Sequence, residues 1–355
     1  MVRNTLIKIL LAPFSLLYGV GISFRNFLYR NGLLKGIVFN IPVISVGNLS
    51  IGGTGKTPHI EYLIRLLKDY IEVATLSRGY QRKTKGYLEI KPNFNAEQSG
   101  DEPLQYARKF QDILVAVGED RSYAIPEIMK YHPGTQVVLL DDAFQHLSVK
   151  PGLNILLTEF SNPFTRDYLL PSGRLREWRS SYERADVIVV SKCPSEMTIA
   201  EKEKMTAEIN PFPHQKIFFS KYEYGYPYYI FNWSQRFRID SDWDVLVICA
   251  IANTDYLLNN LTPLVNSVKV MAFEDHHFFR AYDIGRLKET FDNIDSKKKI
   301  IITTEKDAMR LELHRQFLIE NQLPIMVLPV EVSFLFNENG AFDDIVKEFM
   351  LNFKS

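Results

Sequence analysis

The sequence predicts an α/β protein built on a doubly wound, mostly parallel sheet, with a second and smaller α/β domain. Two observations support this fold class. Short apolar runs rich in β-branched residues alternate with segments of helical periodicity, which is the pattern of a parallel sheet covered by helices. An aromatic, extended stretch at residues 218–233 interrupts the alternation, which then resumes. The chain is therefore expected to contain two α/β units.

Composition agrees with two domains and limits the class of partner. With 355 residues and 46% hydrophobic content, the chain is long enough for two cores, and it contains no repeat or low-complexity tract. Lys+Arg equals Asp+Glu at 42 each, so no global field favours nucleic acid, and we expect none as a partner. Cys193 and Cys249 adjoin apolar runs, as expected for reduced core thiols in the cytosol.

The N-terminal segment has a different character. No charge occurs in residues 9–24, basic residues flank this run on both sides, and no acidic residue precedes Glu61. A spanning helix requires about 20 apolar residues, whereas this run is shorter and contains Pro13. We therefore expect a helix that lies in the membrane plane or inserts partly, with its basic flanks facing anionic lipid. A helix packed on the protein's own core is the other interpretation.

The first strong motif is a glycine-rich turn that follows an apolar run, VISVGNLSIGGTGKTP at residues 43–58. A phosphate-binding loop needs glycines so that N–H groups can converge on phosphate, a lysine for the β- and γ-phosphates, and a hydroxyl for Mg²⁺. Ser50 stands where the usual pattern has its first glycine, so a mere left-handed glycine turn is the structural alternative. The residues assigned to nucleotide binding are Gly52, Gly53, Thr54, Gly55, Lys56 and Thr57.

A second motif strengthens this assignment. Residues 137–140 are typical of a fully buried parallel strand, and Asp141 and Asp142 follow them directly. A carboxylate at that point holds the metal ion across the site from a phosphate-binding loop. The two aspartates would otherwise be loop caps. Because the two motifs occur in the right order, we predict a P-loop NTPase-like domain that binds a nucleotide and Mg²⁺.

Periodicity and turn signals give the other elements of the first domain. A helix at residues 59–70 follows the loop, and another opens at SGDEP, residues 99–103, where proline and acidic residues favour a helix N-terminus. A third helix is predicted at residues 122–131. Buried strands are predicted at residues 73–77, 113–117, 154–158 and 187–191.

The second α/β unit is predicted to begin with a strand at residues 245–250 and to continue with strands at 268–273 and 299–304. Extended segments bracket it, which suggests a hinge of two strands, and an amphipathic helix at residues 342–353 closes the chain. The predicted organisation is a membrane-associating helical segment (1–35), a P-loop domain (36–217), hinge strands (218–241 and 324–336), a second α/β domain (242–323) and a closing helix packed on the first domain (337–355).

Other polar residues are candidates for the chemistry. Asp101 is either a helix cap or a general base that accepts a proton from an acceptor hydroxyl. Lys306 and Asp307 form an ion pair or contact the nucleotide. On a strand the side chains of His276 and His277 diverge, and no further ligand has recognisable spacing, so a metal site there is disfavoured. The candidates for an anion clamp are Arg78, Arg121, Arg174 and Arg176.

Two other function classes use a similar loop. A regulatory GTPase would carry N-K-x-D after a late strand, but the candidate segment 191–194, SKCP, lacks both the asparagine and the aspartate. A membrane scaffold similar to partition ATPases would need a dimer closed around ATP, which the sequence neither indicates nor excludes. A membrane-associated nucleotide hydrolase or switch protein is therefore the alternative to a kinase.

The order and spacing of the motifs resemble the tetraacyldisaccharide 4′-kinase family. The motifs are VGNLSIGGTGKTP, SRGY, SGDEP, GEDR, DDAFQH, LLPSGRLRE, FEDHHFF and TTEKDAMR. The resemblance implies an enzyme of lipid A (lipopolysaccharide) biosynthesis at the cytoplasmic face of the bacterial inner membrane. Its implied reaction is transfer of the ATP γ-phosphate to the 4′-hydroxyl of a tetraacylated glucosamine disaccharide 1-phosphate. The implied partners are this lipid A precursor and the membrane surface, with no protein partner.

The same resemblance assigns roles to individual residues. Asp101 would be the general base, and His276 from the second domain would tune it as a carboxylate–imidazole pair. The residues implied around the metal ion are Thr57, Glu102, Asp141 and Asp142.

Three positions depart from the family pattern. Ala143 replaces the glycine of DDGFQH, Trp178 replaces the proline of LREP, and Thr254 ends a segment that reads GIxNP in the family. None of these changes removes a chemical group with an assigned role, so activity is expected.

Overall fold

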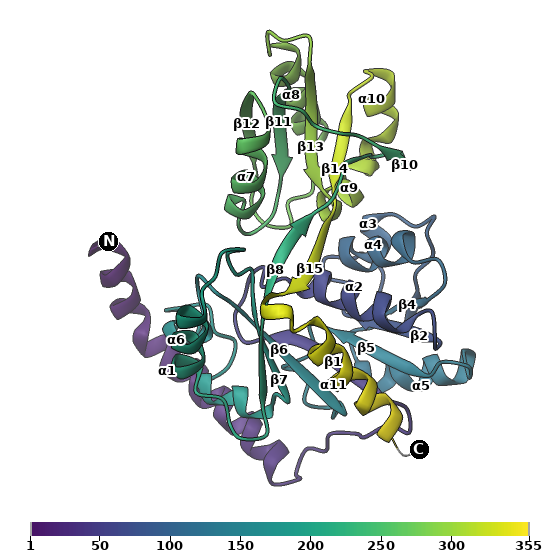
Figure 1. The fold of residues 1–355 in the computed structure, drawn as a ribbon. Helices are drawn as coiled ribbons and strands as arrows, with labels where there is room; N and C mark the ends of the chain where they lie inside the picture. Colours follow the sequence, from purple (N-terminus) through teal and green to yellow (C-terminus); the bar gives the residue numbers. More distant parts are fainter. Residues whose placement is uncertain (1, 354–355) are drawn as a thin grey trace.

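The computed structural model describes residues 2–353, so Met1 and residues 354–355 of the two predicted end segments lie outside it. Figure 1 shows two lobes joined by a pair of strands, with both ends of the chain on the larger lobe. The larger lobe contains a nine-stranded sheet and the smaller lobe a six-stranded sheet. The predicted α/β class with a second, smaller α/β unit is confirmed.

The larger sheet has the strand order β15-β8-β7-β6-β1-β5-β2-β4-β3. The strands from β8 to β4 pair in parallel, and an antiparallel strand closes each edge. The carboxyl ends of the central strands therefore meet at one edge, where doubly wound sheets bind their ligands. The strands are β1 (Val43–Asn48), β2 (Val73–Ser77), β3 (Leu88–Glu89), β4 (Leu114–Val117), β5 (Val137–Asp141), β6 (Leu153–Glu159), β7 (Val187–Ser191), β8 (Lys216–Tyr224) and β15 (Val330–Phe334).

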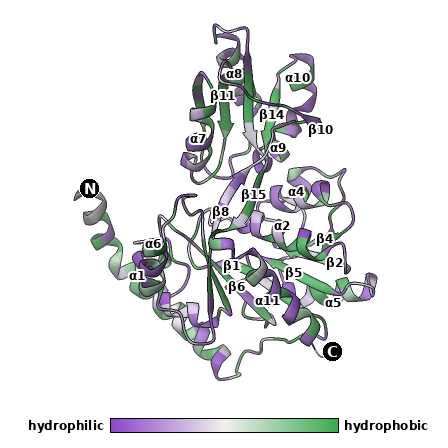
Figure 2. Ribbon diagram, viewed as in Figure 1, coloured by the Kyte–Doolittle hydropathy of each residue, from purple (hydrophilic) through white to green (hydrophobic). Residues whose placement is uncertain are grey.

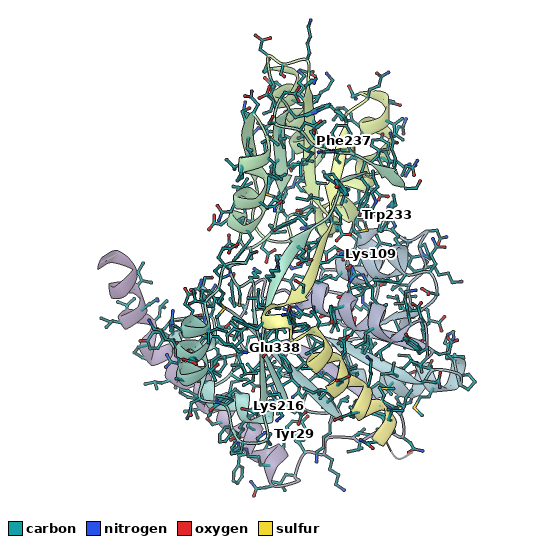
Figure 3. The ribbon with its side chains drawn as sticks, viewed as in Figure 1. Tyr29, Lys109, Lys216, Trp233, Phe237 and Glu338 are labelled. Carbon is teal, nitrogen blue, oxygen red and sulfur yellow. The ribbon has the colours of Figure 1, made fainter. Side chains whose placement is uncertain are left out.

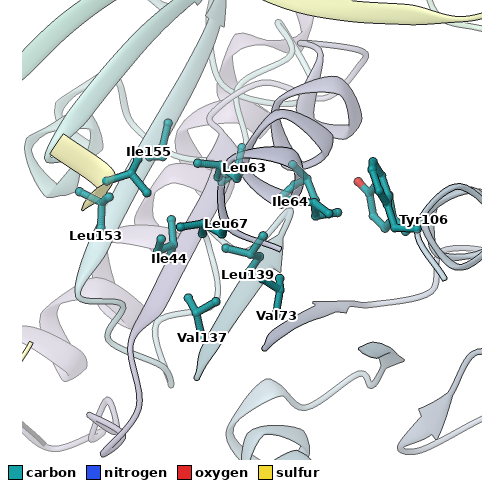
Figure 4. Packing of buried hydrophobic residues seen from close by; sticks show 14 of the residues in the cluster. Ile44, Leu63, Ile64, Leu67, Val73, Tyr106, Val137, Leu139, Leu153 and Ile155 are labelled. Carbon is teal, nitrogen blue, oxygen red and sulfur yellow. The ribbon is translucent and has the colours of Figure 1, made fainter. Parts of the chain in front are cut away.

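Helices cover both faces of this sheet, and the helix after the glycine-rich loop is anchored in its core. Leu63 and Ile64 of α2 are fully buried against Ile44 of β1 and Leu139 of β5 (Figure 4). This packing fixes the N-terminus of α2 at the carboxyl edge of the sheet. The helices of the larger lobe are α1 (Val2–Arg30), α2 (Lys56–Leu67), α3 (Ala96–Ser99), α4 (Asp101–Lys109), α5 (Arg121–Tyr131), α6 (Ile199–Ile209) and α11 (Asn339–Asn352).

The smaller lobe has the strand order β10-β9-β14-β13-β11-β12, and its three predicted strands are confirmed to within one residue at each end. Separate apolar clusters lie on the two faces of this sheet, and Figure 2 shows its central strands as hydrophobic. Its elements are β9 (Tyr228–Tyr229), β10 (Asn232–Arg236), β11 (Asp244–Cys249), β12 (Ser267–Ala272), β13 (Lys299–Thr304), β14 (Ile325–Leu328), α7 (Asp255–Leu261), α8 (Ala281–Asp292), α9 (Glu305–Leu311) and α10 (Arg315–Glu320).

The connection between the lobes is narrower than the predicted hinge ranges 218–241 and 324–336. Within residues 2–353, only β8 and β15 bridge the lobes as an antiparallel pair, whereas β9, β10 and β14 belong to the second sheet. The aromatic side chains of this stretch explain the difference, since Tyr228 is buried in the smaller lobe with its ring 5.0 Å from that of Trp233. Helix α11 returns to the larger lobe, where Phe342 is buried against Phe334.

Helix α1 corrects one expectation from the sequence. It runs without a break through Pro13 and the flanking basic residues, so the apolar run is part of a much longer helix. The proline removes one backbone hydrogen bond but does not end the helix. By length and composition alone, the segment Ile7–Arg30 could cross a membrane, and little of it is buried against the protein.

One side of α1 is attached to the loop that precedes β7. Ser15 Oγ donates to the carbonyl of Leu169 at 3.1 Å, and Trp178 Nε1 donates to Ser23 Oγ at 2.9 Å. A Cβ at Gly19 would lie 2.3 Å from the Trp178 ring, so this glycine makes room for the tryptophan. The remaining surface of the helix exposes large apolar side chains, namely Ile9, Leu10, Phe14, Leu16, Leu17, Val20, Phe24 and Phe27.

Candidate active site

The candidate site lies where the carboxyl edge of the larger sheet faces the smaller lobe. After β1 the chain makes the glycine-rich turn and enters α2 at Lys56. Gly52 and Gly55 have φ angles of 109° and 87°, which residues with side chains rarely adopt. A Cβ at residue 55 would also lie 2.7 Å from the hydroxyl of Tyr222. The loop thus presents the N-terminus of α2, a position at which helices bind phosphate.

Neighbouring side chains hold this loop in place. Asn48 Nδ2 donates to Thr54 Oγ1 at 2.8 Å, and Ser191 Oγ donates to the carbonyl of Thr54 at 2.8 Å. All three residues are buried. These contacts of Thr54 therefore hold the loop in its turned conformation.

Lys56 points at the aspartates that follow β5. Its Nζ lies 3.8 Å from Oδ1 of Asp142, and Arg176 donates to the same oxygen at 2.7 Å. Burial alone would raise the pKa of Asp142, but Lys56 and Arg176 outweigh it and hold that pKa below its ordinary value. Asp142 is therefore ionised at neutral pH.

Asp141 is in a different state although it is adjacent. Tyr106 donates its hydroxyl to Asp141 Oδ2 at 2.9 Å, and Asp141 Oδ1 is buried with no partner. Burial, Glu102 and Asp142 raise the pKa of Asp141 to about 7, although Lys56 opposes the shift. Such a carboxylate lacks a positive partner, which a bound cation would supply.

The donors around this point fit a magnesium ion. Thr57 Oγ1 lies 3.4 Å from Glu102 Oε1, so the predicted hydroxyl and carboxylate ligands are already adjacent. Among the residues that the structure describes, no group of three or more His, Cys, Asp or Glu side chains stands ready to hold a metal alone. Mg²⁺ does not require such a cage, because it binds through one or two carboxylates together with water and substrate phosphates. The uncompensated oxygen of Asp141 is the feature that favours it here.

Asp101 meets His276 across the two lobes. The carboxylate oxygen Oδ2 lies 3.3 Å from His276 Nδ1, while Oδ1 accepts a hydrogen bond from the backbone N–H of Glu102 at 2.9 Å. The helix cap is Gly100, so capping is not the role of the Asp101 side chain. Its Oδ2 atom is buried without a well-formed hydrogen bond, and it can therefore accept one from a substrate.

Two cations from α9 approach Asp101 and its neighbour Glu102. Arg310 Nε lies 3.6 Å from Asp101 Oδ2, and Lys306 Nζ lies 3.0 Å from Glu102 Oε1. Burial would raise the pKa of Asp101, but Lys306, His276 and Arg310 together lower it below its ordinary value. Burial likewise opposes the charge on Lys306, yet Glu102 and Asp101 raise its pKa. Both groups therefore carry charge at neutral pH.

The local structure around His276 differs from the predicted strand. Strand β12 ends at Ala272, so His276 and His277 lie in a turn, and His276 has a φ of 61°. Its backbone N–H donates to the carbonyl of Ala250 at 3.1 Å, which holds this uncommon conformation. His277 turns away from the site and pairs with Asp283 at 2.9 Å.

The four predicted clamp arginines are not brought to one place. Arg176 binds Asp142, as described above. Arg121 is buried near the same aspartate, and burial lowers its pKa to about 10 although Asp142 and Asp141 oppose this. Arg78 is exposed at the end of β2. Arg174 instead pairs with Asp167 at 3.0 Å on the side that holds α1.

Besides Arg310, three residues of the site were missed in the sequence. Tyr106 orients Asp141 but carries no motif signal, because it is one more aromatic residue on a helix. Asn48 binds the guanidinium of Arg176 with its side-chain oxygen. His146, within DDAFQH, accepts a hydrogen bond from the backbone N–H of Arg121 at 3.2 Å, and burial and that arginine lower its pKa to about 4. The motif could have identified His146.

The comparison with known proteins agrees with this site. Residues 7–350 match the family described as tetraacyldisaccharide-1-P 4′-kinase, LpxK. The tetraacyldisaccharide 4′-kinase of Phocaeicola vulgatus is 41% identical over 98% of this chain and 97% of its own length. The enzyme of the same name from Bacteroides fragilis is 42% identical over 94% of this chain and 90% of its own length.

A solved structure shows the same fold over nearly the whole chain. LpxK from Aquifex aeolicus, crystallised in complex with ATP, matches with a TM-score of 0.73 and 30% identity, covering 97% of this chain and 99% of that chain. The resemblance found in the sequence motifs is thereby confirmed. The chain belongs to the tetraacyldisaccharide-1-P 4′-kinase family.

Proposed function

We propose that this protein transfers the γ-phosphate of ATP to the 4′-hydroxyl of a tetraacylated glucosamine disaccharide 1-phosphate in lipid A biosynthesis. One observation carries the proposal. Asp101 is buried and ionised, has one oxygen free of a well-formed hydrogen bond, and precedes Glu102, whose Oε1 lies 3.4 Å from Thr57 at the start of α2. A loop alone would serve a hydrolase or a switch, whereas a kinase with an alcohol acceptor needs such a carboxylate. The names of the curated relatives and the ATP complex of the Aquifex protein support this donor and acceptor.

The larger lobe supplies the electrostatics of phosphate binding. The N-terminus of α2 and the amine of Lys56 attract the β- and γ-phosphates, and Arg176 adds positive charge on the other side of Asp142. Thr57, Glu102, Asp141 and Asp142 are the residues that would hold Mg²⁺. When bound, Mg²⁺ draws negative charge from the phosphate oxygens and thereby favours attack by an uncharged alcohol.

Asp101 then acts on the acceptor. Its Oδ2 accepts the proton of the 4′-hydroxyl while the alcohol oxygen bonds to the γ-phosphorus and the bond from that phosphorus to ADP breaks. A carboxylate is a weak base for an alcohol, so we expect it to contribute about 10²- to 10⁴-fold. The larger part of the acceleration comes from holding the reactants in line.

The smaller lobe completes the site. His276, Lys306 and Arg310 all belong to it, and each lies within 3.6 Å of a carboxylate of the larger lobe. Separation of the lobes would remove all three side chains from Asp101 and Glu102 at once. Closure therefore assembles the base and also keeps water away from the γ-phosphate.

Helix α1 accounts for access to a lipid substrate. Its large apolar side chains are exposed, and the exposed Lys8 lies along the same helix, whereas Arg25 turns toward the protein and pairs with Glu177. We propose that this helix holds the protein on the cytoplasmic face of the inner membrane, peripherally or partly inserted. ATP is available on that side, and the acyl chains of the acceptor can remain in the bilayer.

A transfer assay tests the function. Purified protein receives γ-labelled ATP, Mg²⁺ and the tetraacyl disaccharide 1-phosphate in detergent micelles, and the lipid is analysed for a second phosphate at the 4′ position. We expect label on the lipid, and loss of this activity in Lys56→Ala without a change in melting temperature, because Lys56 neutralises the moving phosphoryl group. Label found only in inorganic phosphate, or a strong preference for GTP, would favour the hydrolase or switch alternative.

A further inference from the structure

Lys306 lies between His276, which faces the proposed base Asp101, and Glu102, one of the proposed metal ligands. It is the second residue of α9, and its side chain is 20% exposed. Its Nζ lies 3.0 Å from Oε1 of Glu102 in the larger lobe and 3.1 Å from Nε2 of His276 in its own lobe. One ammonium group thus contacts the neighbour of Asp101 and the ring that faces Asp101.

The contact with His276 has a definite polarity. A lysine ammonium has three N–H donors and no acceptor, so Nε2 of His276 must be the acceptor in their hydrogen bond. A neutral imidazole that accepts on Nε2 carries its hydrogen on Nδ1. Nδ1 is the nitrogen that lies 3.3 Å from Oδ2 of Asp101. The lysine therefore favours, together with Asp101, the tautomer that turns an N–H toward the carboxylate.

Apart from Asp101 and Lys306, the neighbours of His276 fix the position of its ring but not its tautomer. The backbone of His276 is held at a φ of 61° by the carbonyl of Ala250, and the ring packs edge-on against Tyr80 with centroids 4.8 Å apart. Neither contact involves a ring nitrogen as donor or acceptor. With the opposite tautomer, a nitrogen lone pair would face the anionic Asp101, which is unfavourable.

The contact between Lys306 and Glu102 fixes the position of the Lys306 ammonium group, and through it the position of the His276 ring. Lys306 and Thr57 both approach Oε1 of Glu102, at 3.0 Å and 3.4 Å. Because Glu102 belongs to α4 and Lys306 to α9, this ion pair joins the two lobes directly beside the base. The pair is only partly exposed, at 20% and 19%, so solvent screens it less than a surface pair.

We propose that Lys306 is a positioning residue for phosphoryl transfer, which holds His276 in the Nδ1-protonated tautomer and sets its place relative to Asp101 through the contact with Glu102. The kinetic consequence rests on the proposed function. The tautomer does not, because it is a property of the folded protein without substrate.

Nitrogen-15 NMR of the histidine rings tests the tautomer directly. The full-length protein is labelled at its histidines, and the signals of His276 are assigned by comparison with His276→Gln. At neutral pH we expect wild type and Lys306→Arg to show His276 protonated on Nδ1, and Lys306→Met to shift it toward Nε2 protonation. Lys288→Met, which removes an exposed lysine of α8 paired with Asp292, should leave the His276 signals unchanged.

Kinetics then separates positioning from nucleotide binding. Lys306→Met should lower kcat about 10- to 100-fold while changing the KM for ATP less than about threefold, and Lys306→Arg should recover most of the loss. A rise in the KM for ATP with kcat preserved would make Lys306 a nucleotide ligand and overturn the proposal. An unchanged His276 tautomer in Lys306→Met would also overturn it.

The wild-type spectrum decides the question even where a variant fails to fold. Nε2 protonation of His276 in the wild-type protein contradicts the proposal outright. A wild type that shows the Nδ1 tautomer but transfers no phosphate to lipid would instead refute the proposed function and leave the tautomer result standing.

Discussion

His276 Nδ1 lies 3.3 Å from Asp101 Oδ2, although the two residues belong to different lobes. The carboxylate–imidazole pair forms only when the two lobes are in contact. Asp101 is buried near the end of the larger sheet, and His276 reaches it from a turn in an uncommon backbone conformation. The base of the candidate site is thus a product of lobe packing, and its function depends on how well the lobes are held together.

The exposed apolar face of α1 should control membrane affinity. In the triple variant Leu10→Gln, Leu17→Gln and Phe24→Gln, each change removes at least about 1 kcal/mol of burial in lipid, so affinity for anionic vesicles should fall roughly 100-fold. Co-sedimentation with phosphatidylglycerol vesicles measures the loss. These side chains are exposed by 62–73%, so the melting temperature should hardly change.

A matched triple variant provides the control for that experiment. Tyr70, Tyr131 and Leu351 are also exposed but lie outside α1, and their replacement by glutamine should leave vesicle binding intact. The α1 variant could instead unfold and still bind vesicles. That result would show that the apolar face of α1 is part of the protein core and that another part of the protein binds the membrane.

Asp141 should make the protein less stable as the pH rises. Its folded-state pKa is raised to about 7 from an ordinary value of 3.8, so between those pH values the native state holds a proton that the unfolded chain has lost. The stabilisation is complete below about pH 4 and is lost as the pH passes about 7, with an upper limit of about 4 kcal/mol.

Thermal unfolding between pH 5 and pH 8, without Mg²⁺, checks this expectation against Asp141→Asn. From pH 5 to pH 8 the melting temperature of the wild type should fall further than that of the variant, because residue 141 of the variant cannot ionise. Burial and Glu61 raise the pKa of Glu305 to about 7, although Lys109 opposes the shift. Glu305 therefore also lowers stability as the pH rises, and it does so equally in the wild type and in Asp141→Asn. Parallel curves would mean that Asp141 is not the strained carboxylate described here.

Lys109 should be essential for stability where the lobes meet (Figure 3). Its Nζ lies 2.7 Å from Glu61 and 2.6 Å from Glu305, so it joins α2 of the larger lobe to α9 of the smaller lobe. Lys109→Met leaves two buried carboxylates facing each other and should cost about 3–5 kcal/mol of unfolding free energy.

Denaturant unfolding measures the cost, and a second change identifies its origin. Glu305→Gln added to Lys109→Met removes one of the opposed charges and should restore part of the loss. Lys68→Met, which breaks an exposed pair with Asp112, should leave the unfolding midpoint nearly unchanged. Equal effects of Lys109→Met and Lys68→Met would show that the inter-lobe ion pairs add nothing to stability.

The order of elements could be predicted because local patterns determine it. Strands such as residues 299–304 are buried on both faces, so their apolar runs are continuous, and the predicted and observed limits agree. The predicted helix at 59–70 begins earlier, at Lys56, because the glycine-rich loop itself turns into the first helical residues. Apolar periodicity cannot detect a polar first turn, so the sequence placed this helix start too late.

The site could be predicted only in part, for a physical reason. Asp142 follows β5 directly, and Lys56 follows β1 through the glycine-rich loop. Because parallel strands bring their carboxyl ends together, the proximity of these two residues follows from topology. Tyr106 and Arg310 approach the aspartates only through tertiary packing of helices, and no spacing in the sequence reports it. The length of α1 was missed for a related reason, since the apolar run ends well before the helix does.

The pair Asp101 and His276 allows the most direct test of the whole account. Asp101→Ala and His276→Ala should each lower kcat about 10²-fold or more with little change in the KM for ATP, because both act on the acceptor proton and not on the nucleotide. Asp101→Asn, which retains the shape, should be as inactive as Asp101→Ala. Melting temperatures of all variants show whether a loss of rate is a loss of folding.

The decisive measurement is the kcat of the double variant Asp101→Ala with His276→Ala. If the two residues act as a unit across the lobes, the double variant should be scarcely slower than the slower single variant, since residues of one catalytic unit are not additive. Independent losses that multiply to about 10⁴-fold or more would contradict the account, because the two side chains would then contribute separately.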